Sequence, residues 1–474
     1  MDCRRFSFLV PLLLAGSPCR GDSASGETRQ VYLLPKKLPP LSEPDPVGEK
    51  EMAVVEPLYE AVLKENEALI RRGRIAEATQ RLLGVVPEAS RTAAHNLYLG
   101  NMLFALDPKK SQALHLEALR QQPASSLTNL EAAFELQRAG QGKAACVLYE
   151  RYLAKNPNHK VINSLWAHCL LEQGDTRRAI DAWKRADHPR KHVQIDETIF
   201  EVFGFRNPWA IRSELMGKIG ASNAENSLAA LLRHDLQWPI NWWNSKPALD
   251  LARDDLAAFG GQAAPEVRES LTLFLDVAEG HASPSTELRA RVREHLKQRG
   301  QKLPTQLLRG LVDFGTRGKI VSAQEAFDWL RPTLEKRLLS PAASADEAEF
   351  LAALALGHDA ALFAKMDSLC WEKFKNRTCA ESHFIAMAGS AALTLSDPGF
   401  KAALQAFPES SLLHLAALEL TPKGGKQEQE AIRRVILADF HNLSTSNGAL
   451  GDRASYGIKT FFSRLEQSLA PAPQ

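Results

Sequence analysis

The sequence predicts an all-α protein in which helical hairpins stack into a solenoid, and three observations lead to this fold class. Between residues 126 and 187, a pattern of small and aromatic residues recurs after 34 residues. Over most of the chain, apolar residues recur at three- and four-residue spacing, as they do on one face of an α-helix. The alternation of apolar and polar residues that is typical of strands is nearly absent.

The repeated pattern consists of a glycine, an alanine and an aromatic residue, each with its own steric role. The glycine can take the left-handed backbone conformation that ends a helix. The alanine allows two helices to cross closely, and the aromatic side chain fills the space one turn later. Pro157 ends the unit because it cannot donate a hydrogen bond to a continuing helix. The matched residues are Gly140, Ala145 and Tyr149, then Gly174, Ala179 and Trp183, with Ala133 and Ala167 on the preceding helices.

These residues resemble the tetratricopeptide repeat, whose signature contains a Leu-Gly pair, aromatic residues, alanine and proline within 34 residues. The resemblance implies a right-handed superhelix of hairpins over residues 51–190. It also implies that protein or peptide partners bind along the concave face. Earlier copies are indicated by Leu99, Gly100, Ala113 and Pro123, and by Gly73, Ala78 and Pro87 in a shortened first copy.

The composition is that of an ordinary globular protein. Of the 474 residues, 45% are hydrophobic and 24% are charged. The formal net charge is +2, from 58 basic and 56 acidic residues. A dedicated nucleic-acid-binding protein normally carries a clear basic patch or excess, so we expect no nucleic-acid partner.

Residues 1–26 are typical of a secretory signal peptide, because Arg4 and Arg5 precede a short apolar run that is followed by small and polar residues. We therefore expect an exported protein, either periplasmic or secreted. Cys19 could carry a lipid, but the residues before it match a bacterial lipobox poorly. Residues 27–50 are rich in proline and predict an extended linker. No later apolar run reaches the roughly 20 residues that span a bilayer.

After the repeats, residues 191–262 predict an irregular connecting segment with one helix near 223–234. Asn207-Pro208-Trp209 predicts a turn within it. Three tryptophans near its end allow two interpretations: an aromatic platform for sugar rings or a peptide, or a hydrophobic plug over the end of the repeat stack. These residues are Trp238, Trp242 and Trp243.

Residues 263–474 predict a C-terminal α-helical domain of degenerate, tetratricopeptide-like hairpins. Apolar residues keep helical spacing throughout this region. The expected helix pairs are 345–356 with 358–374, 379–395 with 398–407, and 411–420 with 427–439.

The sequence contains no motif whose spacing indicates catalysis. His-Glu-x-x-His, Gly-x-Ser-x-Gly and a dinucleotide fingerprint after a strand are all absent. His188, His192 and Asp196 could share one helix face, but a metal site needs a fuller set of ligands. His234 and Asp235 have no nucleophile at a recognised spacing. We therefore expect a non-enzymatic protein without a metal or cofactor.

Four cysteines follow the predicted signal peptide. Cys146 and Cys169 fall on facing helices of consecutive repeats, where packed free thiols are expected. Cys370 and Cys379 flank a predicted turn between helices. In an oxidising compartment, a disulfide between these two could close a small loop.

The resemblance also implies which side chains bind the partner, because the first helix of each tetratricopeptide unit lines the concave surface. The positions it implies are Tyr98 and Asn101, then Glu131, Phe134 and Arg138, and then His168 and Glu172. The Lys and Asn set by which some family members clamp a peptide carboxylate is not reproduced, since Leu97, Leu130 and Leu165 stand where polar groups would be wanted. We therefore expect an amphipathic partner segment that is held by apolar contact and oriented by charge.

The function predicted from the sequence is that of an exported, non-enzymatic scaffold for protein or peptide binding. The alternative is a cell-envelope enzyme or glycan-binding protein whose site lies near the tryptophan-rich segment.

Overall fold

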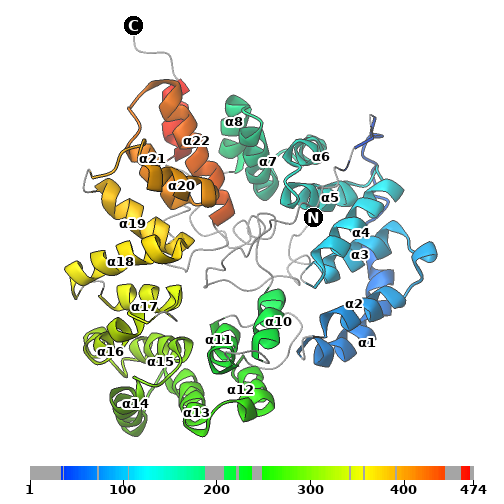
Figure 1. The fold of residues 1–474 in the computed structure, drawn as a ribbon. Helices are drawn as coiled ribbons and strands as arrows, with labels where there is room; N and C mark the ends of the chain where they lie inside the picture. Colours follow the sequence, from blue (N-terminus) through cyan, green and yellow to red (C-terminus); the bar gives the residue numbers. More distant parts are fainter. Residues whose placement is uncertain are drawn as a thin grey trace. The chain divides into compact units, whose positions relative to one another are not determined.

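A computed structural model describes residues 32–469. It leaves out 33, 36, 72–73, 105, 187–207, 220–223, 238–247, 341–342, 356–357, 390–391 and 443–460. Every regular element in the described part is a helix, which confirms the predicted all-α fold class (Figure 1). Contacts divide the chain into two compact modules. The middle module comprises residues 211–408, and the repeat module comprises the described residues from 32 to 210 together with those after 408.

The repeat module begins with four consecutive helical hairpins, as the 34-residue pattern predicts, and each hairpin packs against the next. Their second helices begin at once after short turns. The helices are α1 (Glu49–Arg71), α2 (Ile75–Gly84), the 3₁₀-helix η2 (Glu88–Ser90), α3 (Ala93–Leu103), α4 (Pro108–Gln121), α5 (Ser126–Arg138), α6 (Gly142–Lys155), α7 (Lys160–Glu172) and α8 (Thr176–Ala186).

The turn glycines have the backbone conformation that their position in the repeat predicts. Gly140 and Gly174 have φ angles of 74° and 81°. After Gly140, the Gln141 amide donates to the Leu136 carbonyl at 2.7 Å, and after Gly174 the Asp175 amide donates to Leu170 at 2.9 Å. These bonds close a Schellman motif, which satisfies the last carbonyls of the first helix and reverses the chain.

The small residues of the repeat lie where the helices cross. Ala133, Ala145, Ala167 and Ala179 are each fully buried, and so is Tyr149. A larger side chain at one of the alanines would overpack the crossing, at a typical cost of about 1–3 kcal/mol. The periodic alanines therefore set the distance between neighbouring helices.

A polar contact also recurs with the repeat, and it was not predicted from the sequence. Asn129 Nδ2 donates to the Pro123 carbonyl at 3.0 Å, and Arg151 Nε donates to Asn129 Oδ1 at 3.0 Å. At an offset of 34 residues, Asn163 Nδ2 donates to Pro157 at 2.8 Å and Arg185 Nε donates to Asn163 Oδ1 at 3.1 Å. We call this contact the Asn–Arg clasp. It ties the loop before each first helix to the following second helix.

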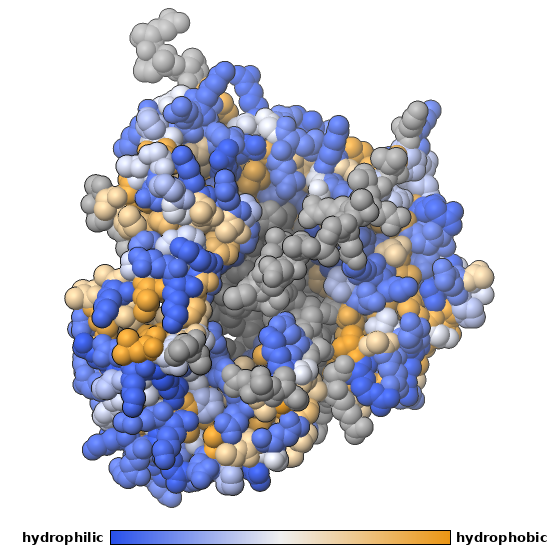
Figure 2. Space-filling view, viewed as in Figure 1, coloured by the Kyte–Doolittle hydropathy of each residue, from blue (hydrophilic) through white to orange (hydrophobic). Residues whose placement is uncertain are grey.

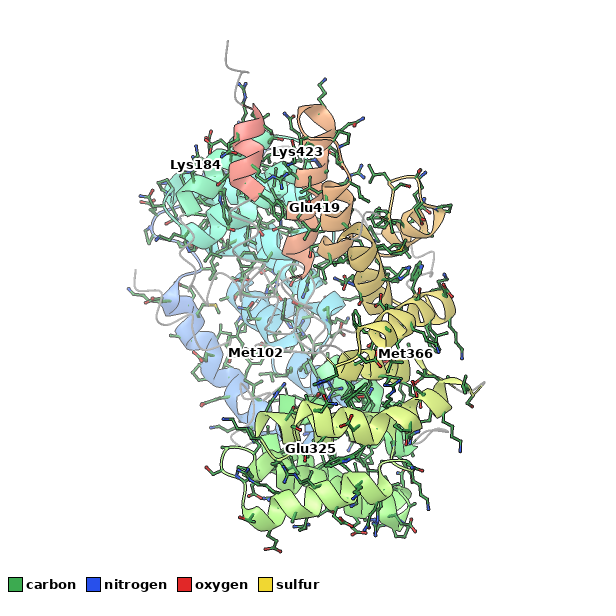
Figure 3. The ribbon with its side chains drawn as sticks, turned by 90° about the vertical axis from the view of Figure 1, so that its left-hand side faces the viewer. Met102, Lys184, Glu325, Met366, Glu419 and Lys423 are labelled. Carbon is green, nitrogen blue, oxygen red and sulfur yellow. A yellow bond between two sulfur atoms is a disulfide. The ribbon has the colours of Figure 1, made fainter. Side chains whose placement is uncertain are left out.

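The last helices of the chain complete the repeat module. Trp183 of α8 stacks on Phe462, with ring centroids 4.6 Å apart. Lys184, labelled in Figure 3, pairs with Glu466 beside this contact. Arg433 Nη1 donates to the Leu171 carbonyl at 3.2 Å. The helices concerned are α21 (Ser411–Glu419), α22 (Gly425–Asn442) and residues 461–469.

These contacts differ from the domain division that the sequence suggested. Residues after 408 were expected to belong to one C-terminal domain with 263–408, but they pack on α7 and α8 instead. Their apolar side chains join the same core as the repeats, among them Leu418, Ile432 and Val435. The apolar surface of the fourth hairpin is thus covered by a distant part of the chain. The tryptophans at 238, 242 and 243 lie outside the described residues.

The middle module is also built from consecutive helices, and the pairs predicted at 345–374 and 379–407 are present within it. Three of its helices lie in the segment expected to be irregular, where a single helix near 223–234 was predicted. One begins at Pro208, where a turn was predicted, because proline is favoured in the first helical turn. The elements are α10 (Pro208–Ile219), α11 (Ala224–Gln237), α12 (Ala248–Phe259), the 3₁₀-helix η3 (Gly260–Gln262), α13 (Pro265–Gly280), α14 (Thr286–Arg299), α15 (Thr305–Arg317), α16 (Ala323–Leu338), α17 (Ala345–Ala355), α18 (Ala360–Phe374), α19 (Arg377–Gly389) and α20 (Pro398–Ala406).

A buried ion cluster joins the first three helices of the middle module. Arg212 of α10 donates two hydrogen bonds to Asp255 of α12, at 2.6 and 2.7 Å, and another to Asp235 of α11. Burial raises the pKa of Asp235, and the neighbouring Asp255 raises it further against the opposing effect of Arg212. Removing the cation would leave the two buried carboxylates uncompensated, which is strongly destabilising.

Helix ends in the middle module are also satisfied locally. At the start of α16, Ser322 Oγ accepts from the Glu325 amide at 3.1 Å, while the Glu325 carboxylate accepts from the Ser322 amide at 2.9 Å. These reciprocal bonds form a capping box, and Glu325 is labelled in Figure 3. Cys370 and Cys379 are joined by a disulfide between α18 and α19.

In the face drawn in Figure 2, hydrophilic residues predominate among those described, and hydrophobic ones are scattered between them. No described helix combines the length and apolar composition needed to cross a bilayer.

Candidate protein-binding surface

The seven positions implied by the family resemblance lie on α3, α5 and α7, the first helices of three successive hairpins. The structure does not expose all of them. Tyr98 is buried and packs on Tyr59 of α1, with ring centroids 5.3 Å apart. Burial, with smaller effects from Glu56 and Glu60, raises the pKa of Tyr98 to about 12. The prediction that Tyr98 is exposed for binding is wrong, because the first hairpin covers it.

His168 is likewise buried, with an exposed fraction of 0%. Its Nδ1 lies 3.1 Å from Nε2 of Gln137, and the Tyr149 hydroxyl donates to Gln137 Oε1 at 2.7 Å. These three side chains form a polar chain that links α5, α6 and α7. His168 therefore stabilises the contact between hairpins, and its predicted exposure is also wrong.

Phe134 occupies an intermediate position. It is half-buried, packs against the core, and its ring centroid lies 6.0 Å from that of Tyr149. One edge of the ring can reach a partner, but the other contributes to packing. Truncation of Phe134 is therefore expected to lower stability as well as any binding that depends on it.

A second polar cluster joins α3, α4 and α5, and most of its members were not predicted. His115 of α4 places Nδ1 3.1 Å from Glu135 Oε1 and Nε2 3.0 Å from Asn101 Oδ1. Ser111 Oγ donates to the same Glu135 oxygen at 2.9 Å. Burial alone would raise the pKa of Glu135, but hydrogen bonds from His115 and Ser111 and the charge of Arg138 lower it overall. The carboxylate is thus held ionised beneath the surface.

Gly100 makes this cluster possible. A methyl group on its α-carbon would come within 2.3 Å of Nε2 of His115. The glycine of the Leu-Gly pair therefore does more than allow helices to cross, since it makes room for the imidazole ring between α3 and α4. Sequence patterning identified Gly100 but not the ring that it accommodates.

Arg138 is held in place at the edge of this cluster. It pairs with Glu135, its Nη2 donates to the Pro108 carbonyl at 3.4 Å, and its guanidinium carbon lies 4.4 Å from the ring centroid of Phe104. The side chain retains 18% exposure. A cation fixed by a carboxylate and an aromatic ring loses little entropy when it meets a partner.

Two further carboxylates lie along the same face. Burial raises the pKa of Glu131, and the charge of His115 opposes this only in part. Burial likewise raises the pKa of Glu172 to about 7, against a smaller opposing effect of Arg433. The Glu172 carboxylate lies against the α5–α6 turn, where a methyl group on Gly142 would come within 2.1 Å of its Oε2.

We use the name first-helix face for the surface that carries the partly exposed side chains of α3, α5 and α7. The structure places five of the seven predicted residues on this face and buries the other two. The five are Asn101, Glu131, Phe134, Arg138 and Glu172.

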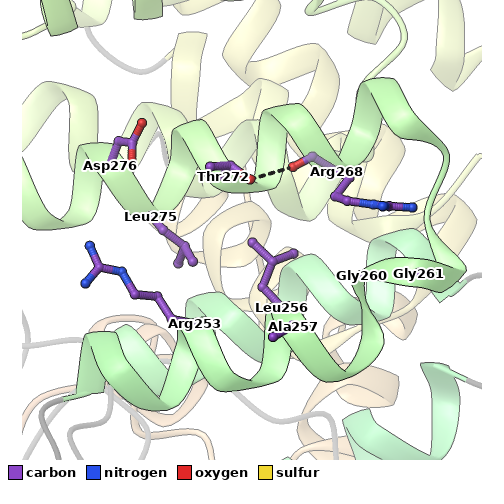
Figure 4. A pocket seen from close by; sticks show the side chains of 9 residues that line it. All are labelled: Arg253, Leu256, Ala257, Gly260, Gly261, Arg268, Thr272, Leu275 and Asp276. Atoms are coloured by element: carbon purple, nitrogen blue, oxygen red, sulfur yellow. Dashed lines mark hydrogen bonds between the residues drawn. The ribbon is translucent and has the colours of Figure 1, made fainter.

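A separate cavity of about 390 Å³ lies between α12 and α13 of the middle module (Figure 4). Leu256 and Leu275 point toward one another across it, and Arg253, Arg268 and Asp276 stand around its rim. Arg253 is paired with Glu279 at 2.6 Å. None of the predicted site residues lines this cavity.

Candidate metal ligands do not form a site in the described part of the chain. The one grouping there with suitable spacing is Glu349 with Cys370 and Cys379, and the disulfide occupies both sulfurs. Asp235, which is buried next to His234 in the sequence, pairs with Arg212, and this ion pair compensates the charge of the buried carboxylate. His188, His192 and Asp196 lie outside the described residues.

Comparisons with known proteins add little to this description. No family model matches the chain, and no curated protein is similar to it in sequence. Among solved structures it is similar to the TPR domain of P58(IPK), with 15% identity over 80% of this chain and 99% of that chain and a TM-score of 0.20. Such a low score supports no further argument. The description as tetratricopeptide-like hairpins therefore depends on the chain's own repeated residues and contacts.

Proposed function

We propose that this protein is an exported, non-enzymatic scaffold whose repeat module binds a protein or peptide segment on the first-helix face. The observation that carries the proposal is the arrangement of a half-buried aromatic ring, a fixed guanidinium and two carboxylates along α5 and α7. The guanidinium of Arg138 is held by Glu135 and the Phe104 ring, which suits recognition rather than bond cleavage. Support for export comes from the signal-peptide pattern of residues 1–26.

The charges on this face indicate the chemistry of the partner. Arg138 is largely neutralised by Glu135. The positive charge near the other two carboxylates is weaker: His115 only partly opposes the raised pKa of Glu131, and Glu172 has a smaller effect from Arg433 and a 3.8 Å contact with His168 Nδ1. The partner that fits is an amphipathic segment with an apolar side chain for Phe134, basic side chains for the two carboxylates and a hydrogen-bond acceptor for the exposed part of the Arg138 guanidinium. A single patch of this size supports an affinity in the micromolar class.

Affinity capture from the native envelope, with the mature protein as bait, tests the proposal. Arg138→Glu should remove the pair with Glu135 and reduce recovery of the partner at least tenfold, whereas Arg177→Glu, an exposed change on α8, should leave it unchanged. Arg138→Met provides a second variant without a new negative charge. Equal recovery with both Arg138 variants, at normal helical circular dichroism, would show that binding occurs elsewhere, with the tryptophan-rich segment as the next candidate.

A further inference from the structure

Part of the proline-rich stretch that was expected to be an extended linker lies on the repeat module. We call residues 32–47 the N-terminal strap; they pass alongside α4, α5 and α6 (Figure 1). At one end the Tyr32 amide donates to Gln141 Oε1 at 2.9 Å. Farther along, Arg151 Nη2 donates to the Pro39 carbonyl at 2.7 Å, and the Ser42 amide donates to the Ala124 carbonyl at 2.8 Å.

The strongest contact of the strap is made by Asp45. Its Oδ2 accepts from the Ser126 amide at 2.8 Å and the Leu127 amide at 3.1 Å, and also from the Ser126 hydroxyl. Its Oδ1 accepts from the Val47 amide at 2.9 Å, which fixes the turn of the strap. The carboxylate thus caps the first turn of α5, where free amide groups and the helix dipole favour a negative charge.

Apolar side chains of the strap cover the core of the repeats. Tyr32, Leu34 and Leu38 are partly buried against the cluster formed by the hairpin helices. Prolines at 35, 39, 40, 44 and 46 restrict the strap to extended conformations, which lowers the entropy lost on docking. By contrast, Glu43 reaches Lys155 at 2.9 Å on the open surface, where an ion pair contributes little.

Arg151 connects the strap to the repeated architecture. The same guanidinium holds Asn129 of the Asn–Arg clasp and donates to the Pro123 carbonyl at 3.2 Å. Its bond to Pro39 adds a main-chain acceptor from a segment 112 positions away. The strap is therefore bound by side chains whose positions the repeat fold already fixes. A separate peptide would be bound in the same way.

We propose that the surface of α4, α5 and α6 beneath the strap is a second peptide-docking groove, and that residues 32–47 are its intramolecular ligand. The external partner that fits it is an extended, proline-containing segment with a leucine and, seven positions later, an aspartate, as at Leu38 and Asp45. Such a segment competes with the strap for the α5 N-terminus and Arg151. This groove is distinct from the first-helix face, so the two proposals can fail separately.

The test uses the full chain and a fluorescent synthetic peptide of residues 32–50. The Asp45→Ala chain should bind this peptide in anisotropy measurements at least tenfold more tightly than the wild-type chain, whose groove is filled. A peptide with the same Asp45→Ala change should lose that binding. The Glu43→Ala chain, which loses only the exposed ion pair with Lys155, is the matched control and should behave as the wild type does.

Hydrogen exchange of the wild-type chain provides a measurement that does not depend on a variant folding. Excess unlabelled peptide should speed exchange of the Ser42 amide, since displacement of the strap breaks its bond to Ala124. If this amide exchanges only with global unfolding, whatever the peptide concentration, the strap is a permanent part of the core and the proposal is wrong. A folded Asp45→Ala chain that fails to bind the peptide would overturn it as well. Normal peptide binding by an Asp45→Ala, Arg138→Glu chain would separate this groove from the first-helix face.

Discussion

The repeat module and the middle module are both all-helical, but they hold their helices together in different ways. In the repeat module the same contacts recur: the turn glycines close the same motif twice, and the Asn–Arg clasp returns after one period. Among the described residues of the middle module, two links between helices occur once each: the ion cluster around Arg212 and the disulfide between α18 and α19. A contact that recurs from one repeat to the next places the same residue types at a fixed spacing in the sequence, whereas a contact that occurs once produces no such spacing.

The largest effect that separates the modules is expected from Arg212→Met. This change leaves Asp235 and Asp255 buried without their cation, which typically costs about 3–5 kcal/mol. Hydrogen exchange of the full chain measures the free energy of opening for each helix. This free energy should fall in α10–α12 and stay unchanged in α5–α7.

A triple variant provides the control for this prediction. Arg212→Met with Asp235→Asn and Asp255→Asn removes all the charges together and should recover most of the lost stability. A loss below about 1 kcal/mol for Arg212→Met alone would show that the cluster is solvated and does not hold the middle module together.

The next effect concerns the disulfide of the middle module. Replacing Cys370 and Cys379 by serine should lower the free energy of unfolding by at most about 3 kcal/mol, because the bond closes a short loop. Alkylation without reductant, followed by peptide mapping of the exported protein, should label Cys146 and Cys169 after denaturation but not the bonded pair. Labelling of all four would contradict both the disulfide and the oxidising compartment.

The fold of the repeat module could be predicted because each hairpin meets the same steric demand. Gly140, Ala145 and Tyr149 have fixed roles in one unit, and their counterparts have the same roles in the next. The packing of α22 on α7 and of residues 461–469 on α8 could not be predicted in this way, since it joins segments far apart in the chain. The start of α10 at Pro208 was missed for a local reason: proline favours both turns and helix starts.

The candidate site was predictable only in part. Helical position alone cannot show that α1 covers Tyr98 or that His168 turns toward Gln137. A usable signal did exist for the Asn–Arg clasp, because Asn, Arg and Pro recur after 34 residues. His115 and Ser111 gave a weaker signal, as two polar residues four positions apart on the buried side of a helix.

A smaller effect tests the close fit of the repeats. Gly100→Ala places a methyl group against the His115 ring and should cost about 1–3 kcal/mol through overpacking. Gly84→Ala is the matched control, because nothing lies within 4 Å of the added carbon there. Equal melting temperatures for the two variants would show that the imidazole ring moves aside without cost.

The smallest effect is a pH dependence that belongs to the first-helix face. Glu172 has a folded-state pKa of about 7, above its ordinary value of 4.5. Between these values the folded protein binds more protons than the unfolded chain, so the free energy of unfolding falls as pH rises. Above pH 7 the Glu172 carboxylate is ionised in both states, so the free energy of unfolding stays lowered by the full cost of its partly buried charge.

Glu172→Gln removes this titration. Relative to the wild type, the variant should gain about 1 kcal/mol between pH 5 and pH 8, after allowance for solvent screening of a carboxylate that is 31% exposed. Thermal unfolding at both pH values measures the gain, with Glu150→Gln on the exposed side of α6 as the matched control. The same carboxylate should strengthen capture of a basic partner as pH rises from 6 to 8. A variant that gains stability equally at both pH values would show that Glu172 titrates in the folded chain as it does in the unfolded one, and that the first-helix face carries its full negative charge throughout.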